Sequence, residues 1–550
     1  MAKITSRFSE YFPGVTPRLE ELAGLASPLR PLDQILETAQ AARGLSIEDV
    51  ASLMSWGSDP ALGEKIHAAA RALRERISGR TVEIIIPEYL TSFCQNDCLY
   101  CGYRKSNALA ERVRLSLSEY ERELDLILAW GHRQIELVLS DDPDFGAEQL
   151  VPYVELTRRK LAELGGGMVA LNAPAYNEET YRILNRTGLD WVALWQETYD
   201  EAQFGRWHFQ GSPKREYAFR LDVWDRVISA GFSRVALGIL FGLHDWRFEV
   251  LALAEHAGYL LRTYGIEPHA IGIPRLKPAR GVLASQKPSR YSVSDDEFNL
   301  AISIYRLAFP RTRLFFNTRE TYEFNMSMVA RGDLFTVDCE TLPGAYLRGS
   351  LPGQFATHHY PARSSVKADF AQRGYGCRYL DPEDQPKLAT IEIQPDEIDL
   401  GESLKRVSSE HDEVRLRLLE WENFLEGMHA TPLYLRRVAA RELRERLQFF
   451  ETDYIEHCRQ EEKVIESLQA VAPLNSTRTS QLLIDHERFA VDLDRFQRQI
   501  TSYEQSGDPT VLLTLGGRMI AELLQHLKFE DSLFVLPFSD LAGEHGKESP

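Results

Sequence analysis

The chain of 550 residues is too long for one ordinary domain, and two or three domains are expected. Its apolar fraction of 44% and charged fraction of 26% are those of a soluble globular protein and exclude wholesale disorder. The formal net charge of −18 argues against nucleic acid as a partner, because phosphate backbones select basic surfaces. No apolar core of a signal peptide and no run of about 18 apolar residues is present, so neither secretion nor a membrane span is expected. Three of the six cysteines are clustered, which favours a reducing, cytoplasmic location over a disulfide framework.

The first 80 residues predict a helical N-terminal extension. The stretches LDQILETAQAARG, IEDVASLM and PALGEKIHAAARALRERISG are amphipathic at helical spacing. Ser46 directly precedes the second stretch, in the position of a helix N-cap. His67 lies among alanines in the third stretch, and we interpret it as structural rather than as a ligand.

From residue 82 the pattern changes to short apolar runs, each followed by an amphipathic stretch. The predicted strands lie at 82–86, 134–140, 168–173, 190–195, 234–240, 269–273, 312–317 and 334–338. Eight strands alternating with helices predict a parallel (β/α)8 barrel of the TIM type over residues 81–377. The chemistry of such a barrel lies at the C-terminal ends of its strands.

Three cysteines follow the first predicted strand at the spacing C-x3-C-x2-C. Thiolates of Cys94, Cys98 and Cys101, on one short loop, can converge on one iron–sulfur cluster. No fourth cysteine lies nearby, so one iron of a [4Fe–4S] cluster would be left open for another ligand. Zinc is the alternative, but zinc sites usually take four ligands and more often use C-x2-C pairs. The spacing therefore predicts a [4Fe–4S] cluster.

Polar residues directly after the strands are candidates for the site, although any one of them alone would more often be a loop residue or helix cap. Arg275 and Arg319 differ, because two guanidinium groups at neighbouring strand ends suit fork-like pairing with a substrate carboxylate. The other candidates are Ser140, Asp141, Asp142, Asn172, Gln196, Glu197, Thr198, Tyr199, Asn317, Thr318 and Glu320.

The cysteine spacing, with aromatic Tyr100 directly before Cys101, resembles the signature of the radical S-adenosylmethionine (SAM) enzymes. The resemblance implies that SAM binds the open iron and is cleaved to a 5′-deoxyadenosyl radical. It also implies an electron donor such as flavodoxin or ferredoxin as a partner. The residues expected to bind this cofactor are Tyr100, Asp141, Asn172 and Glu197.

The strings QETY, GILFGL-x-D-x-RFEVLAL, IPRLKPA and TRET resemble, in this order, the tyrosine lyase branch of that superfamily over about residues 60–375. The branch includes 2-iminoacetate synthase and the maturase of [FeFe]-hydrogenase. The resemblance implies cleavage of the Cα–Cβ bond of tyrosine to dehydroglycine (2-iminoacetate) and p-cresol. It implies Arg319 as the contact of the substrate carboxylate and Arg275 as a supporting contact.

Two departures from the branch bear on this expectation. Many relatives carry a Gly-Glu pair after the second strand that helps hold the amino group of SAM, where this chain has Ser140-Asp141-Asp142. Either Asp141 or Asp142 substitutes for this pair, or the contact is lost. The maturase binds a second cluster through three C-terminal cysteines. Here Cys377 and, about 40 residues earlier, Cys339 are the cysteines on offer, so no second cluster is expected.

Two alternatives remain open. Tryptophan could replace tyrosine, because the aromatic residues near the strand ends (Trp195, Phe241 and Phe316) do not separate phenol from indole. A non-catalytic iron or oxygen sensor is the other alternative. The altered motif after the second strand favours it, and the intact cysteine triad argues against it.

The C-terminal part predicts an all-α domain. Residues 378–402 are acidic and proline-containing and predict an interdomain linker. Residues 403–541 predict a four-helix bundle, with helices at 404–427, 431–467, 476–504 and 508–535 broken at Pro432, Pro473 and Pro509, and a tail at 542–550. One histidine falls on each helix, and two of them have a glutamate at i+4 on the same face. Inward-facing sets of this kind make di-iron sites in bundles.

This segment resembles the hemerythrin-like (HHE) cation-binding domain. The resemblance implies a site for two irons or other divalent metals, with the ligands His411, His457, Glu461, His486, His526 and Glu530. Asp531 is an alternative to Glu530, and Ala490 stands where a hemerythrin has a second histidine after His486. We interpret Cys458 as an ordinary buried thiol. The fusion suggests that the bundle senses or consumes oxygen near an oxygen-sensitive cluster, or supplies iron.

Overall fold

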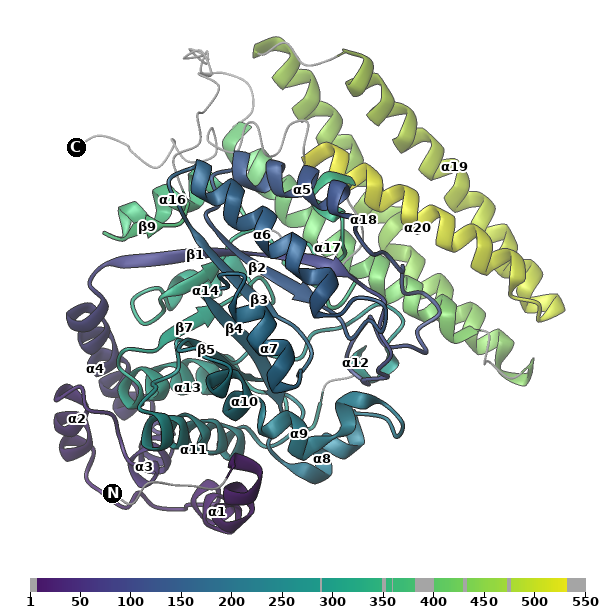
Figure 1. The fold of residues 1–550 in the computed structure, drawn as a ribbon. Coiled ribbons are helices and arrows are strands. Elements are labelled where there is room, and N and C mark those ends of the chain that lie inside the picture. Colours follow the sequence, from purple (N-terminus) through teal and green to yellow (C-terminus); the bar gives the residue numbers. More distant parts are fainter. Residues whose placement is uncertain are drawn as a thin grey trace. The chain divides into compact units, whose positions relative to one another are not determined.

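The computed structural model describes residues 7–286, 289–348, 353–358, 360–380, 400–428, 433–471 and 476–531 (Figure 1). The chain forms two compact units, an N-terminal one with a parallel sheet and a C-terminal helical one. Most of the linker predicted at 378–402 and all of the tail predicted at 542–550 lie outside the described residues. Within the described residues, no helix is long and apolar enough to cross a membrane.

Four helices precede the sheet and confirm the helical N-terminal extension. They are α1 (Phe8–Ala23), α2 (Leu32–Gln40), α3 (Ile47–Trp56) and α4 (Pro60–Ser78). The side chain of Ser46 accepts a hydrogen bond from the backbone N–H of Asp49, as the predicted N-cap of α3 should. His67 Nδ1 lies 2.8 Å from Ser303 Oγ, which fits a structural role.

Eight parallel strands close into a barrel, which confirms the predicted (β/α)8 fold. They are β1 (Thr81–Thr91), β2 (Gln134–Leu139), β3 (Met168–Asn172), β4 (Trp191–Glu197), β5 (Val235–Ile239), β6 (Ala270–Gly272), β7 (Arg313–Phe316) and β8 (Leu334–Thr336). Each strand pairs with the next in the sequence, and β1 pairs with both β2 and β8. Pairing of the first strand with the last closes the sheet, so all eight C-terminal ends meet at one mouth.

Helices cover the outside of the barrel (Figure 1). They are α5 (Leu117–Ala129), α6 (Ala147–Glu163), α7 (Glu178–Asn185), α8 (Glu201–Trp207), α9 (Tyr217–Leu221), α10 (Val223–Ser229), α11 (Trp246–Tyr264), α12 (Leu283–Gln286), α13 (Asp295–Ala308), α14 (Tyr322–Ser327) and α15 (Ala345–Arg348). The next helix, α16 (Arg363–Gln372), includes residues of both compact units. Two features of the sheet differ from the prediction. β1 continues through Pro87 to Thr91, and a short ninth strand, β9 (Gly376–Arg378), pairs with the start of β1.

The interior of the barrel is filled with apolar side chains below its mouth. Ile85, Ala170, Ala193 and Leu334 belong to this core, and Trp195 and Phe315 pack on it. Trp195 fits because two neighbouring strands carry glycine opposite it. A Cβ at Gly238 or Gly272 would lie 2.1 or 2.9 Å from the indole. The core therefore ends in a floor of two aromatic rings.

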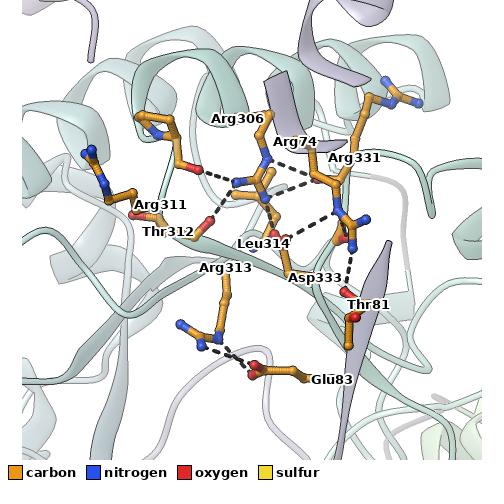
Figure 2. A network of polar contacts seen from close by, with 12 residues as sticks. Arg74, Thr81, Glu83, Arg306, Arg311, Thr312, Arg313, Leu314, Arg331 and Asp333 are labelled. Carbon is orange, nitrogen blue, oxygen red and sulfur yellow. Dashed lines mark hydrogen bonds and ion pairs between the residues drawn. The ribbon is translucent and has the colours of Figure 1, made fainter. Parts of the chain in front are cut away.

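A buried arginine joins the N-terminal extension to the bottom of the barrel (Figure 2). Arg74 of α4 is fully buried and donates to the carbonyl oxygens of Gly332 (3.2 Å) and Thr81 (2.7 Å). Its Nε lies 3.5 Å from Asp333 Oδ1, and Arg306 of α13 donates to the same carboxylate. Two guanidinium groups thus pair with one buried aspartate and donate hydrogen bonds to several carbonyls. These contacts offset the free-energy cost of burying the charges.

The C-terminal unit consists of four long helices. They are α17 (Leu400–Gly427), α18 (Arg436–Val471), α19 (Ser476–Ser506) and α20 (Thr510–Glu530). Its core includes Trp421, whose indole lies 5.2 Å from the ring of Phe450 and 5.1 Å from that of Phe496. Pro509 directly precedes α20, whereas Pro432 and Pro473 lie outside the described residues.

Candidate active site and metal centre

The three clustered cysteines lie on the loop that follows β1 and line a cavity of about 400 Å³ at the mouth of the barrel. None of them forms a disulfide. The loop is held in place by Arg112, which donates to the carbonyls of Ser92 (2.6 Å) and Tyr103 (2.7 Å). Burial raises the pKa of Cys98 to about 11 and that of Cys101 to about 12. These thiols therefore need a cation, such as the iron of a cluster, to become thiolates at neutral pH.

The four residues predicted to bind SAM all line the same cavity. Lys214 connects two of them, because its Nζ donates to Glu197 (2.6 Å) and to the hydroxyl of Tyr100 (3.0 Å). Burial opposes ionisation of Glu197, but Lys214 and Arg220 outweigh it and lower the pKa of this carboxyl. Glu197 thus carries a charge beside the cysteine loop.

Asp141 and Asn172 are each bound to another side chain of the cavity region. The carboxylate of Asp141 accepts hydrogen bonds from Gln95 (3.0 Å) and Asn96 (2.7 Å), so it fastens the cysteine loop to the end of β2. A contact with SAM would have to share this carboxylate. Asn172 donates to Glu136 at 3.2 Å.

In the bundle, all four predicted histidines and both predicted glutamates converge. His411, His457 and Glu461 form one group, and Glu461, His486, His526 and Glu530 form another, each with potential ligand atoms within 4.8 Å of one another. Glu461 belongs to both groups, as a carboxylate that bridges two metals would. Its oxygens lie 2.7 Å from His411 Nε2 and 3.2 Å from His457 Nε2.

Each histidine also has a carboxylate behind it. The outer nitrogen, Nδ1, lies 2.7 Å from Asp531 in His411, 2.6 Å from Glu410 in His457, 3.3 Å from Glu462 in His486 and 3.6 Å from Asp485 in His526. The contacts of His411, His457 and His486 are within hydrogen-bond distance, and carboxylates in this position fix the tautomer of histidine ligands, so that Nε2 presents its lone pair to a metal. The contact of His526 is longer than a hydrogen bond. Asp531 is thus engaged outside the centre, whereas Glu530 Oε1 lies inside it, 3.0 Å from His526 Nε2 and 3.2 Å from His486 Nε2.

The inner atoms of this centre fit a bound metal. His457 Nε2, His526 Nε2, Glu461 Oε2 and Glu530 Oε2 are buried without a hydrogen bond, although all face one another. Burial opposes a charge on His411, but Asp531 and Glu461 outweigh it and raise the pKa of this imidazole to about 10. The donor set is thus one in which metal cations replace protons, and mixed imidazole and carboxylate ligands suit iron, zinc or manganese.

Comparison with known proteins identifies a family for each of the two units. Residues 89–256 match the family profile of the radical SAM superfamily, and residues 403–538 match the hemerythrin HHE cation binding domain. The chain is 31% identical to 2-iminoacetate synthase of Escherichia coli over 345 residues, which are 62% of this chain and 88% of that enzyme. For 2-iminoacetate synthase of Salmonella typhimurium the identity is 30% over 315 residues, or 56% of this chain and 80% of the relative.

The chain belongs to the radical SAM superfamily, among the relatives of 2-iminoacetate synthase. Its fold matches the crystal structure of the [FeFe]-hydrogenase maturase HydG from Carboxydothermus hydrogenoformans, with a TM-score of 0.61 and 26% identity over 80% of this chain and 100% of that one. This membership implies a [4Fe–4S] cluster and SAM. Cys94, Cys98 and Cys101 are the residues that would hold the cluster, and three free thiols around one cavity fit it.

The two arginines that the sequence predicts at the substrate carboxylate have different surroundings in the structure of this radical SAM enzyme. Arg319 lines the cavity, with its guanidinium 3.4 Å from the ring centre of Phe355. Within the described residues, no carboxylate pairs with it. Arg275 does not line the cavity and is bound to Glu320 and Asp295. Because its charge is already neutralised there, the prediction that Arg275 supports the substrate carboxylate has no geometric basis.

The sequence also left several residues of the radical SAM domain unassigned. Glu136, Tyr89 and Cys339 line the cavity, and a charge between the apolar residues Ile135 and Leu137 was the available signal for Glu136. Cys377 lies on β9 beside Val82, at the start of β1. Cys339 follows the other end of the barrel, after β8, so the two do not form one site. In the HHE domain, Asp531 was considered as a ligand, and the other carboxylates behind the histidines were missed because the helical pattern alone does not reveal them.

Proposed function

We propose that this protein is a radical SAM lyase that cleaves the Cα–Cβ bond of tyrosine to 2-iminoacetate and p-cresol. One observation carries the proposal. Arg319 is a guanidinium with no carboxylate partner in the described part of the chain, and it faces the cavity that the three cysteines line. A carboxylate of an amino acid would complete this pairing in a fork-like geometry. The relatives named 2-iminoacetate synthase support the reaction class.

In this proposal the cluster and SAM, when bound, supply the 5′-deoxyadenosyl radical that removes a hydrogen atom from the substrate. The chain's own residues bind and orient the substrate and SAM. Arg319 holds the substrate carboxylate, and the aromatic floor of Trp195 and Phe315 receives an aromatic side chain. Glu197, charged through its contact with Lys214, is placed to bind an ammonium or hydroxyl group of SAM.

We further propose that the HHE domain holds two irons and protects the cluster from oxygen or senses oxygen for the enzyme. The shared position of Glu461 in both ligand groups supports two metals rather than one. Fusion to a domain with an oxygen-sensitive cluster supports the role. Supply of iron to the cluster is the second role that the same site would allow.

Product analysis with the full chain tests the proposed reaction. The protein is reconstituted anaerobically with iron and sulfide and given SAM, a reductant and one aromatic amino acid. We expect 5′-deoxyadenosine and p-cresol with tyrosine. If deoxyadenosine forms with tryptophan but not with tyrosine, tryptophan is the substrate in place of tyrosine. No deoxyadenosine with any amino acid would overturn the lyase and favour a non-catalytic sensor.

A further inference from the structure

Glu136 is a buried carboxyl that no role described so far uses. It lies within β2, points into the barrel and is 5% exposed. Its side chain has one hydrogen bond in the described structure, from Asn172 at 3.2 Å, and no cation pairs with it there. Burial raises its pKa to about 7. A buried carboxyl with one neutral partner is costly, so a second donor is expected to complete it.

The other carboxyls that line the cavity are already hydrogen-bonded or exposed. Asp141 has two amide donors, Glu197 has Lys214, and Glu216 is exposed. Glu136 therefore stands out as the carboxyl that has room for a ligand.

Glu136 and Arg319 lie at different depths of the cavity. Arg319 belongs to the loop after β7, beyond the last strand residue, Phe316. Glu136 lies three residues before the end of β2, which at about 3.3 Å per residue is about 10 Å below the strand end. An amino acid bound through its carboxylate at Arg319 would therefore extend its side chain toward Glu136. The opposite orientation would place two carboxyl groups together, which their charges disfavour.

The surroundings of Glu136 define the chemistry of the group that it would meet. Trp195 and Phe315 line the same cavity as Glu136, with ring centres 6.3 Å apart. Aromatic walls suit an aromatic ring, and a carboxyl in the same cavity suits a hydrogen-bond donor on that ring. Phenol O–H and indole N–H share this character, whereas the ring of phenylalanine lacks it.

We propose that Glu136 is a specificity-determining residue that accepts a hydrogen bond from the ring substituent of the substrate. It thereby selects an aromatic amino acid with a donor over phenylalanine. This inference rests on the proposed function, because it requires that an amino acid binds with its carboxylate at Arg319. Asn172 is a positioning residue in this arrangement, since it holds one oxygen of Glu136.

The test uses the reconstituted full chain as wild type, Glu136→Leu and Glu136→Gln. Initial rates of deoxyadenosine formation give kcat and KM for tyrosine, tryptophan and phenylalanine. For the wild type, we expect kcat/KM about 10- to 100-fold higher with the donor-bearing substrate than with phenylalanine. Glu136→Leu is expected to lose this preference, mainly through KM, while its kcat/KM for phenylalanine does not fall. Glu136→Gln keeps an oxygen acceptor, so its preference for the donor-bearing substrate should fall less than in Glu136→Leu.

Controls separate this residue from folding and from the reaction itself. Glu148→Leu replaces an exposed carboxylate on α6 and should leave all rates unchanged. Iron content and thermal unfolding show whether each variant is intact, and the isosteric Gln variant carries the test if the Leu variant does not fold. Unchanged KM and unchanged preference in intact Glu136 variants would overturn the inference alone. A wild type inactive on all three amino acids would overturn the proposed function, and this inference with it.

Discussion

Arg319 and Arg275 have the same side chain and opposite surroundings. Arg275 is paired with Glu320 and Asp295, whereas Arg319 lies against Phe355 and has no carboxylate partner in the described structure. Burial lowers the pKa of Arg319, which reflects the cost of holding this charge inside the protein. Such a cost is offset when a substrate carboxylate binds, so Arg319 is the residue on which the proposed binding mode depends.

Replacing Arg319 by lysine keeps the charge but removes the planar fork. We expect kcat/KM for tyrosine to fall about 10- to 100-fold, mostly through KM, because a charge-assisted pair of hydrogen bonds is lost. Steady-state formation of deoxyadenosine measures this. Arg311→Lys is the matched control, since Arg311 is 67% exposed and precedes β7 at the far end of the strand. Equal losses in both variants would contradict the role of Arg319.

The metal centre of the bundle makes a prediction that distinguishes its two ligand groups. Glu461→Ala removes the carboxylate shared by both groups and is expected to lose both metals. His457→Ala removes a ligand of one group and is expected to keep about one metal per chain. Metal analysis of the purified full chain gives the counts. Glu420→Ala, an exposed glutamate on α17, should keep both metals. Retention of both metals in Glu461→Ala would contradict the bridging position.

Single residues also show the limit of reasoning from sequence. The ligand histidines were predictable because one falls on each helix, and two carry a glutamate at i+4. The sequence did not predict the carboxylates behind the imidazoles, namely Glu410, Glu462 and Asp485. The bundle has many charged positions, and only the packing of the helices selects those that lie behind a histidine. Glu136 was missed because its strand was recognised from apolar residues, and the one charged residue between them was not considered as part of the site.

At the scale of elements, the strands were predicted well where apolar runs are long and the pattern repeats. The length of β1 was not predicted correctly. Pro87 interrupts the apolar run, but the strand continues to Thr91. The short strand β9 has no apolar run of its own and forms through pairing with β1. Pairing across distant parts of the chain is a tertiary effect that local sequence does not carry.

Helix α4 provides an element-scale test of stability. Arg74→Ala removes the guanidinium that joins this helix to Asp333 and to barrel carbonyls, and is expected to lower the free energy of unfolding by about 3–5 kcal/mol. Denaturation followed by tryptophan fluorescence reports on the barrel unit, because every tryptophan except Trp421 lies there. Arg71→Ala, on the same helix, removes a half-buried arginine whose partner Glu64 is itself exposed, and should change the free energy of unfolding by no more than about 1 kcal/mol. Equal effects of the two would contradict the account.

The docking of α1 on α11 should depend on pH. His256 of α11 stacks on Phe8 of α1 at 3.7 Å, and burial lowers its pKa to about 3. Between about pH 6.5 and 3 the unfolded chain binds a proton here that the folded chain does not, so stability falls as the pH is lowered through this window. The contribution is about 1.4 kcal/mol per pH unit. Unfolding of His256→Gln should show a shallower pH dependence, and an unchanged slope would contradict this.

At the scale of the whole molecule, one chain carries a site for an oxygen-sensitive cluster and a site for two metals. Each site consists of residues of its own unit. The proposed protective role predicts that Glu461→Ala, in the full chain, loses the visible absorbance of its [4Fe–4S] cluster several-fold faster in air than the wild type. Glu420→Ala is again the control. Equal rates of loss in all three proteins would exclude protection and leave sensing or iron supply for the bundle.

Cleavage of the side chain of tyrosine by the barrel unit fixes the ratio of two products. Deoxyadenosine and p-cresol are quantified over time in an anaerobic reaction of the reconstituted full chain with SAM, reductant and tyrosine. We expect the two to accumulate in equal amounts, and both to fall together in Arg319→Lys. Deoxyadenosine without p-cresol, or neither product, would show that the protein does not cleave tyrosine in this way.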